Sequence, residues 1–268
     1  MGGGVGISIY GQYRVATEHA LFAMPETGIG LFPDVGSLYW MPRLLAQHPG
    51  LAVYLALTGA RLKAPDLVYC GLATHYVPSA QLPALEAALV KATTQQSSSL
   101  ASAESIVEPV LSAFHEKPPV EPQASSLAQN QQAIAAVFGP ALDDKQYGVE
   151  NICAALQQRN DDFGRTTLET LATLSPTSLK VTLEGLRRGA AVATLGEDLV
   201  MEYRLAQHCM LPGSDFREGV RATLVDKDGK PQWNPSTLEA VTDEMVDAFF
   251  APIAHEWEIP NDSHAAKL

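Results

Sequence analysis

Two carboxylates lie close together in a loop that is otherwise apolar and uncharged. Glu26 and Asp34 fall within residues 24–36, where proline and glycine interrupt the sequence. Burial in such surroundings disfavours ionisation and raises the pKa of a carboxyl group. A carboxyl group of this kind can act as a base, an acid or a nucleophile. A single acid in a loop is at least as often a water-exposed cap, so it is the pair that favours a catalytic site.

A glycine cluster is the second feature that could do chemistry. Gly2, Gly3, Gly4 and Gly6 stand at an expected loop-to-helix transition. Glycines let backbone N–H groups approach a ligand closely, and a helix N-terminus favours negative charge, so the cluster suits a phosphate or a developing oxyanion. Neither G-x-G-x-x-G nor the Walker sequence fits it, which argues against a nucleotide site. Glycines needed only for a tight turn or close packing are an equal alternative.

Other catalytic classes are disfavoured by spacing. The sequence around Ser8 comes one residue short of the G-x-S-x-G nucleophile elbow, and no histidine has a spacing that pairs with it. We expect His19, His75 and His208 to be surface or packed residues, because no H-x-x-x-H pattern or His/Cys cluster accompanies them. No metal site is predicted.

Short elements on either side must position the acidic loop. Apolar, partly β-branched runs predict buried strands at residues 7–10, 13–17 and 21–23. Helical spacing follows over residues 38–57, and Gly59 is expected to end it. The loop therefore connects compact α/β structure to helices.

The composition divides the chain into three parts. We predict a portion of an α/β core with the active-site loop at 1–92, a Ser/Gln/Pro-rich insertion or linker at 93–132, and a mainly helical region at 133–268. In the third part, Ser175 is a good N-cap with Pro176 in the first turn, and a second helix is predicted over about 197–210.

Composition and charge exclude several classes of protein. The 268 residues are 46% hydrophobic and 18% charged, which predicts a folded core. A net charge of -12 is the wrong sign for tracking nucleic acid or anionic lipid, so neither partner is expected. The longest apolar run is too short and too interrupted to span a membrane. Three scattered cysteines indicate neither a disulfide framework nor zinc, and they fit a reducing compartment.

The motifs taken in order resemble the 3-hydroxyisobutyryl-CoA hydrolase family of the crotonase (enoyl-CoA hydratase/isomerase) superfamily. The resemblance covers nearly the whole chain outside the insertion. It is carried by residues 1–6, 13–18, 22–27, 30–36, 57–59, 71–75, 175–180, 201–204, 215–222, 226–228 and 231–233. It implies an α/β fold with a crotonase-like (ClpP/crotonase) spiral core, here partial, followed by a mainly helical C-terminal region.

The resemblance also implies roles for three residues. The Gly3 N–H would be one of two oxyanion-hole donors that hold the thioester carbonyl. Glu26 would match the catalytic glutamate above the thioester, and Asp34 would bind the 3-hydroxyl and orient the acyl group or water. Gly3, Glu26 and Asp34 are thus the predicted catalytic and substrate-binding residues. Hydratases of the superfamily carry a second glutamate just after the glycines, where this chain has Gly6, and a glycine where it has Asp34.

The implied reaction is hydrolysis of 3-hydroxyisobutyryl-CoA, a 3-hydroxyacyl-CoA thioester, to CoA and 3-hydroxyisobutyrate, as in valine catabolism. Glu26 would act either as general base toward water or as the nucleophile of a mixed anhydride. No cofactor is implied, since CoA is part of the substrate, and no oligomeric state is predicted. An enoyl-CoA hydratase or isomerase of the same superfamily and a non-catalytic binding protein are the alternatives.

Both ends of the chain bear on these expectations. The superfamily's chains begin well before Met1, with core strands, CoA-binding surface and the other oxyanion donor upstream. We therefore expect weak or no activity from the 268 residues alone. Mitochondria are the compartment that the resemblance implies, and Ala266, Lys267 and Leu268 resemble a peroxisomal address, which is the alternative.

Overall fold

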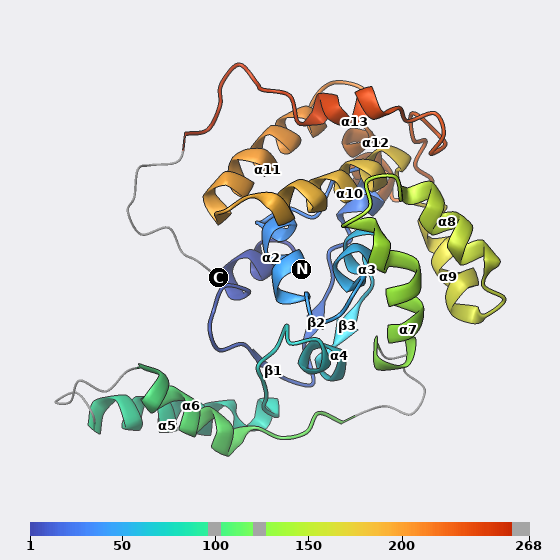
Figure 1. Cartoon of the computed structure of the whole chain (residues 1–268). Coiled ribbons are helices and arrows are strands. Elements are labelled where there is room, and N and C mark those ends of the chain that lie inside the picture. Colours follow the sequence, from blue (N-terminus) through green and yellow to red (C-terminus); the bar gives the residue numbers. More distant parts are fainter. Residues whose placement is uncertain (96–102, 120–126, 259–268) are drawn as a thin grey trace. The chain divides into compact units, whose positions relative to one another are not determined.

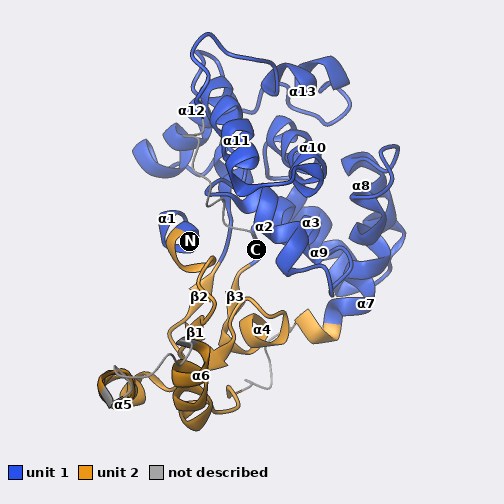
Figure 2. Ribbon diagram, turned by 60° about the vertical axis from the view of Figure 1, so that its left-hand side comes forward, with its two compact units in different colours: residues 1–6, 23–60, 130–268 blue, residues 7–22, 61–129 orange. Residues whose placement is uncertain are grey.

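The computed structural model describes residues 1–95, 103–119 and 127–258. The chain forms two compact units, each assembled from separated stretches of sequence (Figure 2). Unit 1 comprises residues 1–6, 23–60 and 130–268, and unit 2 comprises residues 7–22 and 61–129. All three predicted site residues belong to unit 1.

Within the described residues, unit 2 holds the short strands, three α-helices and one 3-10 helix (Figure 1). Its elements are β1 (Val15–Ala16), β2 (Leu21–Phe22), β3 (Leu62–Lys63), α4 (Ala64–Tyr69), β4 (His75–Tyr76), η2 (Ser79–Gln81), α5 (Leu82–Gln95) and α6 (Ala103–Phe114). Strand β1 pairs in parallel with β4, and β2 pairs antiparallel with β3. Helices α5 and α6 pack together around Val77, Leu85 and Leu111.

Unit 1 is helical. Its elements are η1 (Glu26–Ile29), α2 (Ser37–Leu44), α3 (Leu51–Thr58), η3 (Gly139–Ala141), α8 (Val149–Gln158), α9 (Asp162–Leu171), α10 (Pro176–Ala191), α11 (Leu195–Cys209), α12 (Asp215–Val220), η4 (Arg221–Val225) and α13 (Asp243–Phe249). Helices α1 (Gly3–Ser8) and α7 (Leu127–Phe138) each cross from one unit to the other in sequence.

The core of unit 1 forms where α10 packs on α2 and α3. Leu38, Trp40, Leu55 and Leu186 are fully buried there. A side chain at Gly189 of α10 would collide with the Leu38 carbonyl group, so glycine allows the two helices to approach closely. The acidic loop therefore runs directly into the best-packed part of the unit.

Most predicted elements are confirmed, but the helical run expected over 38–57 is two helices, α2 and α3, separated by residues 45–50. Ser175 caps α10, its hydroxyl accepting from the Ser178 N–H at 3.0 Å, with Pro176 in the first turn. Gly59 ends α3 in a left-handed conformation. The predicted strand at residues 7–10 is wrong, because α1 extends through the first two of these residues and Ile7 is 87% exposed. Glycines and isoleucine are weak helix formers, so the intrinsic propensities favoured a strand over the helix that the structure shows.

Helices occupy part of the segment predicted as an insertion or linker. Residues 93–95 complete α5, and α6 and the first turns of α7 also fall within 93–132. Ser97 to Ser99, Val120 to Pro122 and the C-terminal residues 266–268 lie outside the described residues. The three-part division therefore stays a prediction.

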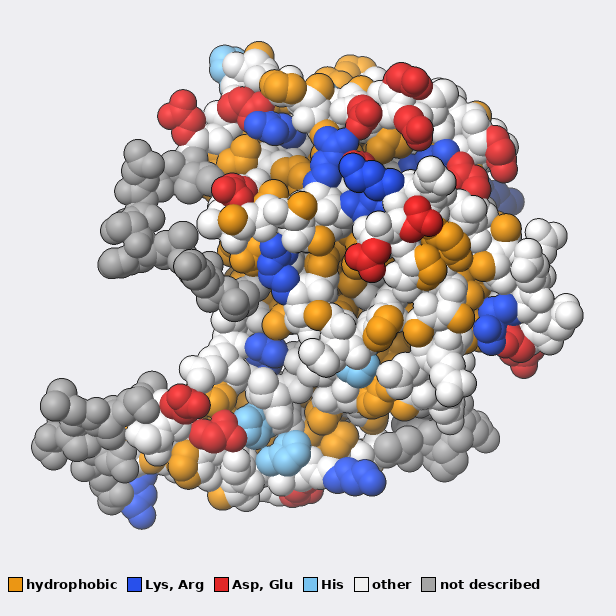
Figure 3. Space-filling view, in the orientation of Figure 1, with side chains coloured by type: hydrophobic (Ala, Val, Ile, Leu, Met, Phe, Trp, Pro, Cys, Tyr) orange, Lys and Arg blue, Asp and Glu red, His pale blue; other side chains and the backbone are white. Residues whose placement is uncertain are grey.

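Charge is distributed in pairs rather than in one basic patch. On the face shown in Figure 3, some Lys and Arg side chains lie beside Asp or Glu and others stand apart from them. Arg188, for example, pairs with Glu184 of its own helix at 2.7 Å and with Asp247 of α13 at 2.5 Å. Within the described ranges, no helix combines the length and the apolar character needed to cross a membrane.

Candidate active site

Glu26 opens the 3-10 helix η1, and only Pro25 separates it from the fully buried Ala23 and Met24. The helix is fastened on two sides. The Thr27 hydroxyl donates to the Leu57 carbonyl at 3.0 Å, and the Ser175 N–H donates to the Thr27 carbonyl at 3.3 Å. The Glu26 backbone is therefore fixed by α3 and by the start of α10.

The Glu26 side chain is buried and protonates easily. It is 7% exposed, and its Oε2 atom has no hydrogen-bond partner among the described residues. Burial, with a smaller contribution from the nearby Asp34 charge, raises the pKa of Glu26 to about 7. A carboxyl group poised near neutral pH can take up and return a proton, as acid–base catalysis requires.

Asp34 lies in a strained loop between η1 and α2. Val35 has φ +58°, a conformation that β-branched residues rarely adopt, and Gly36 has φ +77°. The Asp34 carbonyl accepts from the Ser37 N–H at 3.1 Å. Burial raises the pKa of Asp34 as well. The loop thus presents a half-buried carboxyl group near Glu26, and strained backbone is typical of functional sites.

The glycine cluster contacts this loop. Gly3 begins α1 and is exposed, and Gly6 faces Val35. A Cβ atom at Gly6 would lie 2.8 Å from the Val35 Cβ, so no side chain fits there without movement. Val35 of the neighbouring loop therefore occupies the space beside Gly6, where the resemblance predicts a glutamate in hydratases.

Asp215 supports η1 through α12 and Ser175. The sequence indicated no role for this residue by itself. Its carboxylate accepts from the Ser175 hydroxyl at 2.6 Å and from the Asn234 N–H at 2.8 Å. Helix α12, which Asp215 begins, packs on η1 at Gly30. An aspartate in the first turn of a helix is common, so the sequence offered no signal for this role, and only burial in the fold distinguishes Asp215.

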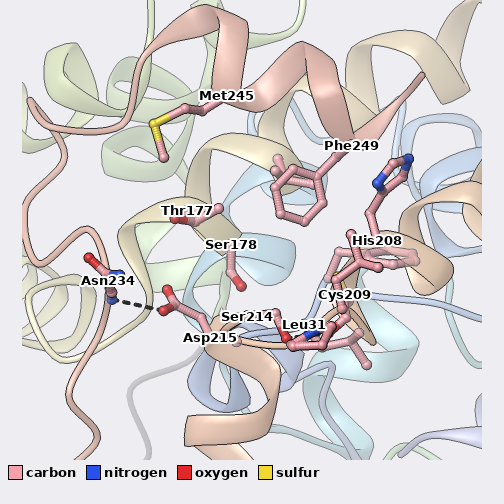
Figure 4. A pocket seen from close by; sticks show the side chains of 16 residues that line it. Leu31, Thr177, Ser178, His208, Cys209, Ser214, Asp215, Asn234, Met245 and Phe249 are labelled. Carbon is pink, nitrogen blue, oxygen red and sulfur yellow. Dashed lines mark hydrogen bonds between the residues drawn. The ribbon is translucent and has the colours of Figure 1, made fainter.

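A cavity of about 240 Å³ lies beside this support (Figure 4). Thr177, Ser178, His208, Asp215 and Phe249 contribute to its lining. Glu26 and Asp34 do not line it. His208 lies in the largely apolar wall of this cavity. The part of the chain that the structure describes contains no cluster of three or more residues able to hold a metal.

The chain belongs to the enoyl-CoA hydratase/isomerase family, whose sequence profile matches residues 1–250. It is 45% identical over 257 residues to the mitochondrial 3-hydroxyisobutyryl-CoA hydrolase of Xenopus tropicalis. The aligned region covers 95% of this chain and 62% of that relative. Identity to the human protein of the same name is 45% over 251 residues, which cover 93% of this chain and 60% of the human protein. The chain therefore spans about three fifths of the length of these curated relatives.

Two solved structures share the fold. A carnitinyl-CoA dehydratase from Mycobacterium thermoresistibile aligns with a TM-score of 0.78 and 34% identity, over 98% of this chain and 68% of that one. An enoyl-CoA hydratase from Rhodobacter sphaeroides 2.4.1 aligns with a TM-score of 0.69 and 33% identity, over 94% and 66%. These matches confirm the expected crotonase-like α/β fold class.

Proposed function

We propose that this chain carries the catalytic carboxyl groups of a thioester hydrolase that converts 3-hydroxyisobutyryl-CoA to CoA and 3-hydroxyisobutyrate. The observation that carries the proposal is the buried Glu26, with a pKa of about 7, beside Asp34, together with the lack of room for a side chain at Gly6. The naming of the curated relatives as 3-hydroxyisobutyryl-CoA hydrolases supports the substrate. Their naming as mitochondrial supports that compartment, in which the reaction serves valine catabolism.

In this mechanism Glu26 promotes attack on the thioester carbonyl carbon by one of two routes. As general base, it removes a proton from water while the water oxygen bonds to that carbon; as nucleophile, it forms an anhydride that water then opens. In either route the C–S bond breaks and the CoA sulfur leaves as a thiol after taking up a proton. The Gly3 N–H is the proposed donor to the carbonyl oxygen, and such donors are worth about 2.7–4 kcal/mol each. Neither proposed route needs a metal or a separate cofactor.

Two assays test the proposal directly. Release of CoA thiol from 3-hydroxyisobutyryl-CoA supports the hydrolase. Loss of crotonyl-CoA absorbance without thiol release supports a hydratase instead, the activity named for one structural neighbour. If neither activity appears when the chain is joined to the N-terminal part of a curated relative, although CoA still stabilises the fold thermally, the chain is a binding protein.

Asp34 is proposed to bind the 3-hydroxyl, and this predicts a change in selectivity. We expect Asp34→Asn to lower kcat/KM for 3-hydroxyisobutyryl-CoA by about 10- to 100-fold, the value of one hydrogen bond to a charged group. The same variant should change kcat/KM for isobutyryl-CoA by less than about threefold. Asp162→Asn, on the exposed start of α9, is the matched control. Equal losses for both substrates would defeat the assignment.

The raised pKa of Glu26 predicts the pH dependence of hydrolysis. Both routes need the ionised carboxylate, so kcat/KM should level off above about pH 7 and fall about tenfold per pH unit below it. Because the Asp34 charge contributes to the raised pKa, Asp34→Asn should move the midpoint to lower pH. Initial rates from pH 5 to 8.5, corrected for spontaneous hydrolysis, provide the measurement. A midpoint near pH 4.5 in the unsubstituted chain would contradict the proposed environment of Glu26.

A further inference from the structure

Glu202 of α11 reaches across unit 1 to the first turn of α2. Its Oε2 accepts from the Gly36 N–H at 2.8 Å, and its Oε1 from the Leu38 N–H at 3.3 Å. The side chain is 5% exposed. Both amides belong to the stretch that directly follows Asp34, so one carboxyl group fastens the end of the acidic loop.

The loop needs this fastening because its backbone is strained. The φ of +58° at Val35 costs on the order of 1–3 kcal/mol, and such strain persists only where the surroundings impose it. Two contacts impose it here. The Val35 side chain packs against Gly6, and the next residue, Gly36, donates its N–H to Glu202. Without the second contact, the loop could relax and carry Asp34 away from Glu26.

The surroundings of Glu202 are costly for a charged group. Asp198, one turn earlier on α11, is fully buried, and Asp34 also faces Glu202; Arg43 of α2 is the cation near Asp198. Burial raises the pKa of both Glu202 and Asp198, and Asp198 raises that of Glu202 further. Buried acids of like charge do not by themselves stabilise a fold. What Glu202 provides is an acceptor for each of two buried amides, which an apolar residue could not supply.

We propose that Glu202 is a positioning residue, which holds Asp34 in place relative to Glu26 by binding the Gly36 and Leu38 amides. The inference rests on the proposed function for its effect on turnover. The loop geometry itself can be tested without any substrate.

Amide hydrogen exchange tests the fastening. Glu202→Gln keeps the size of the side chain but replaces one acceptor oxygen by an NH₂ donor, which cannot bind a second N–H. We expect exchange at Gly36 and Leu38 to accelerate by about 10- to 100-fold, with exchange in α8 and α9 unchanged. Asp198→Asn is the matched control, because it alters the same buried pair but leaves both Glu202 oxygens on the amides. Equal acceleration in both variants, or none in Glu202→Gln, would overturn the proposal.

A double-substitution cycle tests the link to Asp34. For 3-hydroxyisobutyryl-CoA hydrolysis, we expect Glu202→Gln to lower kcat by about tenfold or more with little change in KM. Because Glu202 acts through Asp34, adding it to Asp34→Asn should cost less than about threefold more. Fully multiplicative losses would show a general loss of structure and refute the positioning role. If the unsubstituted chain released no thiol, even when joined to the N-terminal part of a curated relative, the proposed function would fail. The exchange result would still decide whether Glu202 holds the loop.

Discussion

Glu26→Gln is expected to lower kcat for thioester hydrolysis by about 10²- to 10⁴-fold, the usual contribution of a positioned acid–base group. The amide has nearly the same shape as the carboxyl group but can neither accept a proton from water nor attack a carbonyl carbon. The variant leaves Gly3 and Asp34, the other proposed substrate-binding residues, unchanged, so KM should change little. The measurement is release of CoA thiol from 3-hydroxyisobutyryl-CoA at pH 8, where Glu26 is mostly ionised.

The fold should tolerate this substitution. Burial already disfavours the charged form of Glu26, and a neutral amide removes that cost. We therefore expect the free energy of unfolding to change by less than about 1 kcal/mol, measured in urea. Glu169→Gln, on an exposed part of α9, controls for the loss of one charge. Turnover in Glu26→Gln within fivefold of the unsubstituted chain would remove Glu26 from the mechanism.

Local rules predicted the local parts of this fold. The hydroxyl and proline at Ser175 and Pro176 determined the start of α10, and Gly59 determined the end of α3, because each depends only on its neighbours in sequence. The same holds for Glu26 and Asp34, because the apolar residues around them in the chain are enough to indicate raised pKa values. The structure at the start of the chain could not be predicted in this way, because α1 consists of weak helix formers.

Contacts between distant residues could not be predicted in this way. Glu202 lies 166 residues from Gly36, and Asp215 lies 40 residues from Ser175. No periodicity relates such pairs, and in the sequence each acid is a charged residue on a helix like many others. Burial alone distinguishes them, because a buried carboxylate must find donors. The residues that hold the site in place are therefore identified by tertiary packing and not by any local pattern.

Gly30→Ala should be strongly destabilising. Gly30 follows η1 with φ +70°, where a side chain costs about 1–2 kcal/mol. Its new Cβ would also lie 2.5 Å from the Phe216 amide nitrogen and closer still to the Asp215 carbonyl group. Neither backbone can yield cheaply, because Asp215 is held by Ser175 and Asn234. We expect a total loss of about 3–5 kcal/mol in the free energy of unfolding, measured in urea.

Gly229→Ala separates the two causes of this loss. Gly229 has φ +63°, close to that of Gly30, but no atom lies within 4 Å of the position of its Cβ. It should therefore lose only the conformational part, about 1–2 kcal/mol. The difference between the two variants measures how tightly α12 packs on η1, and so how firmly Glu26 is held. Similar losses in both would mean that α12 yields easily, and the catalytic carboxyl group would then owe its position to α3 and α10 alone.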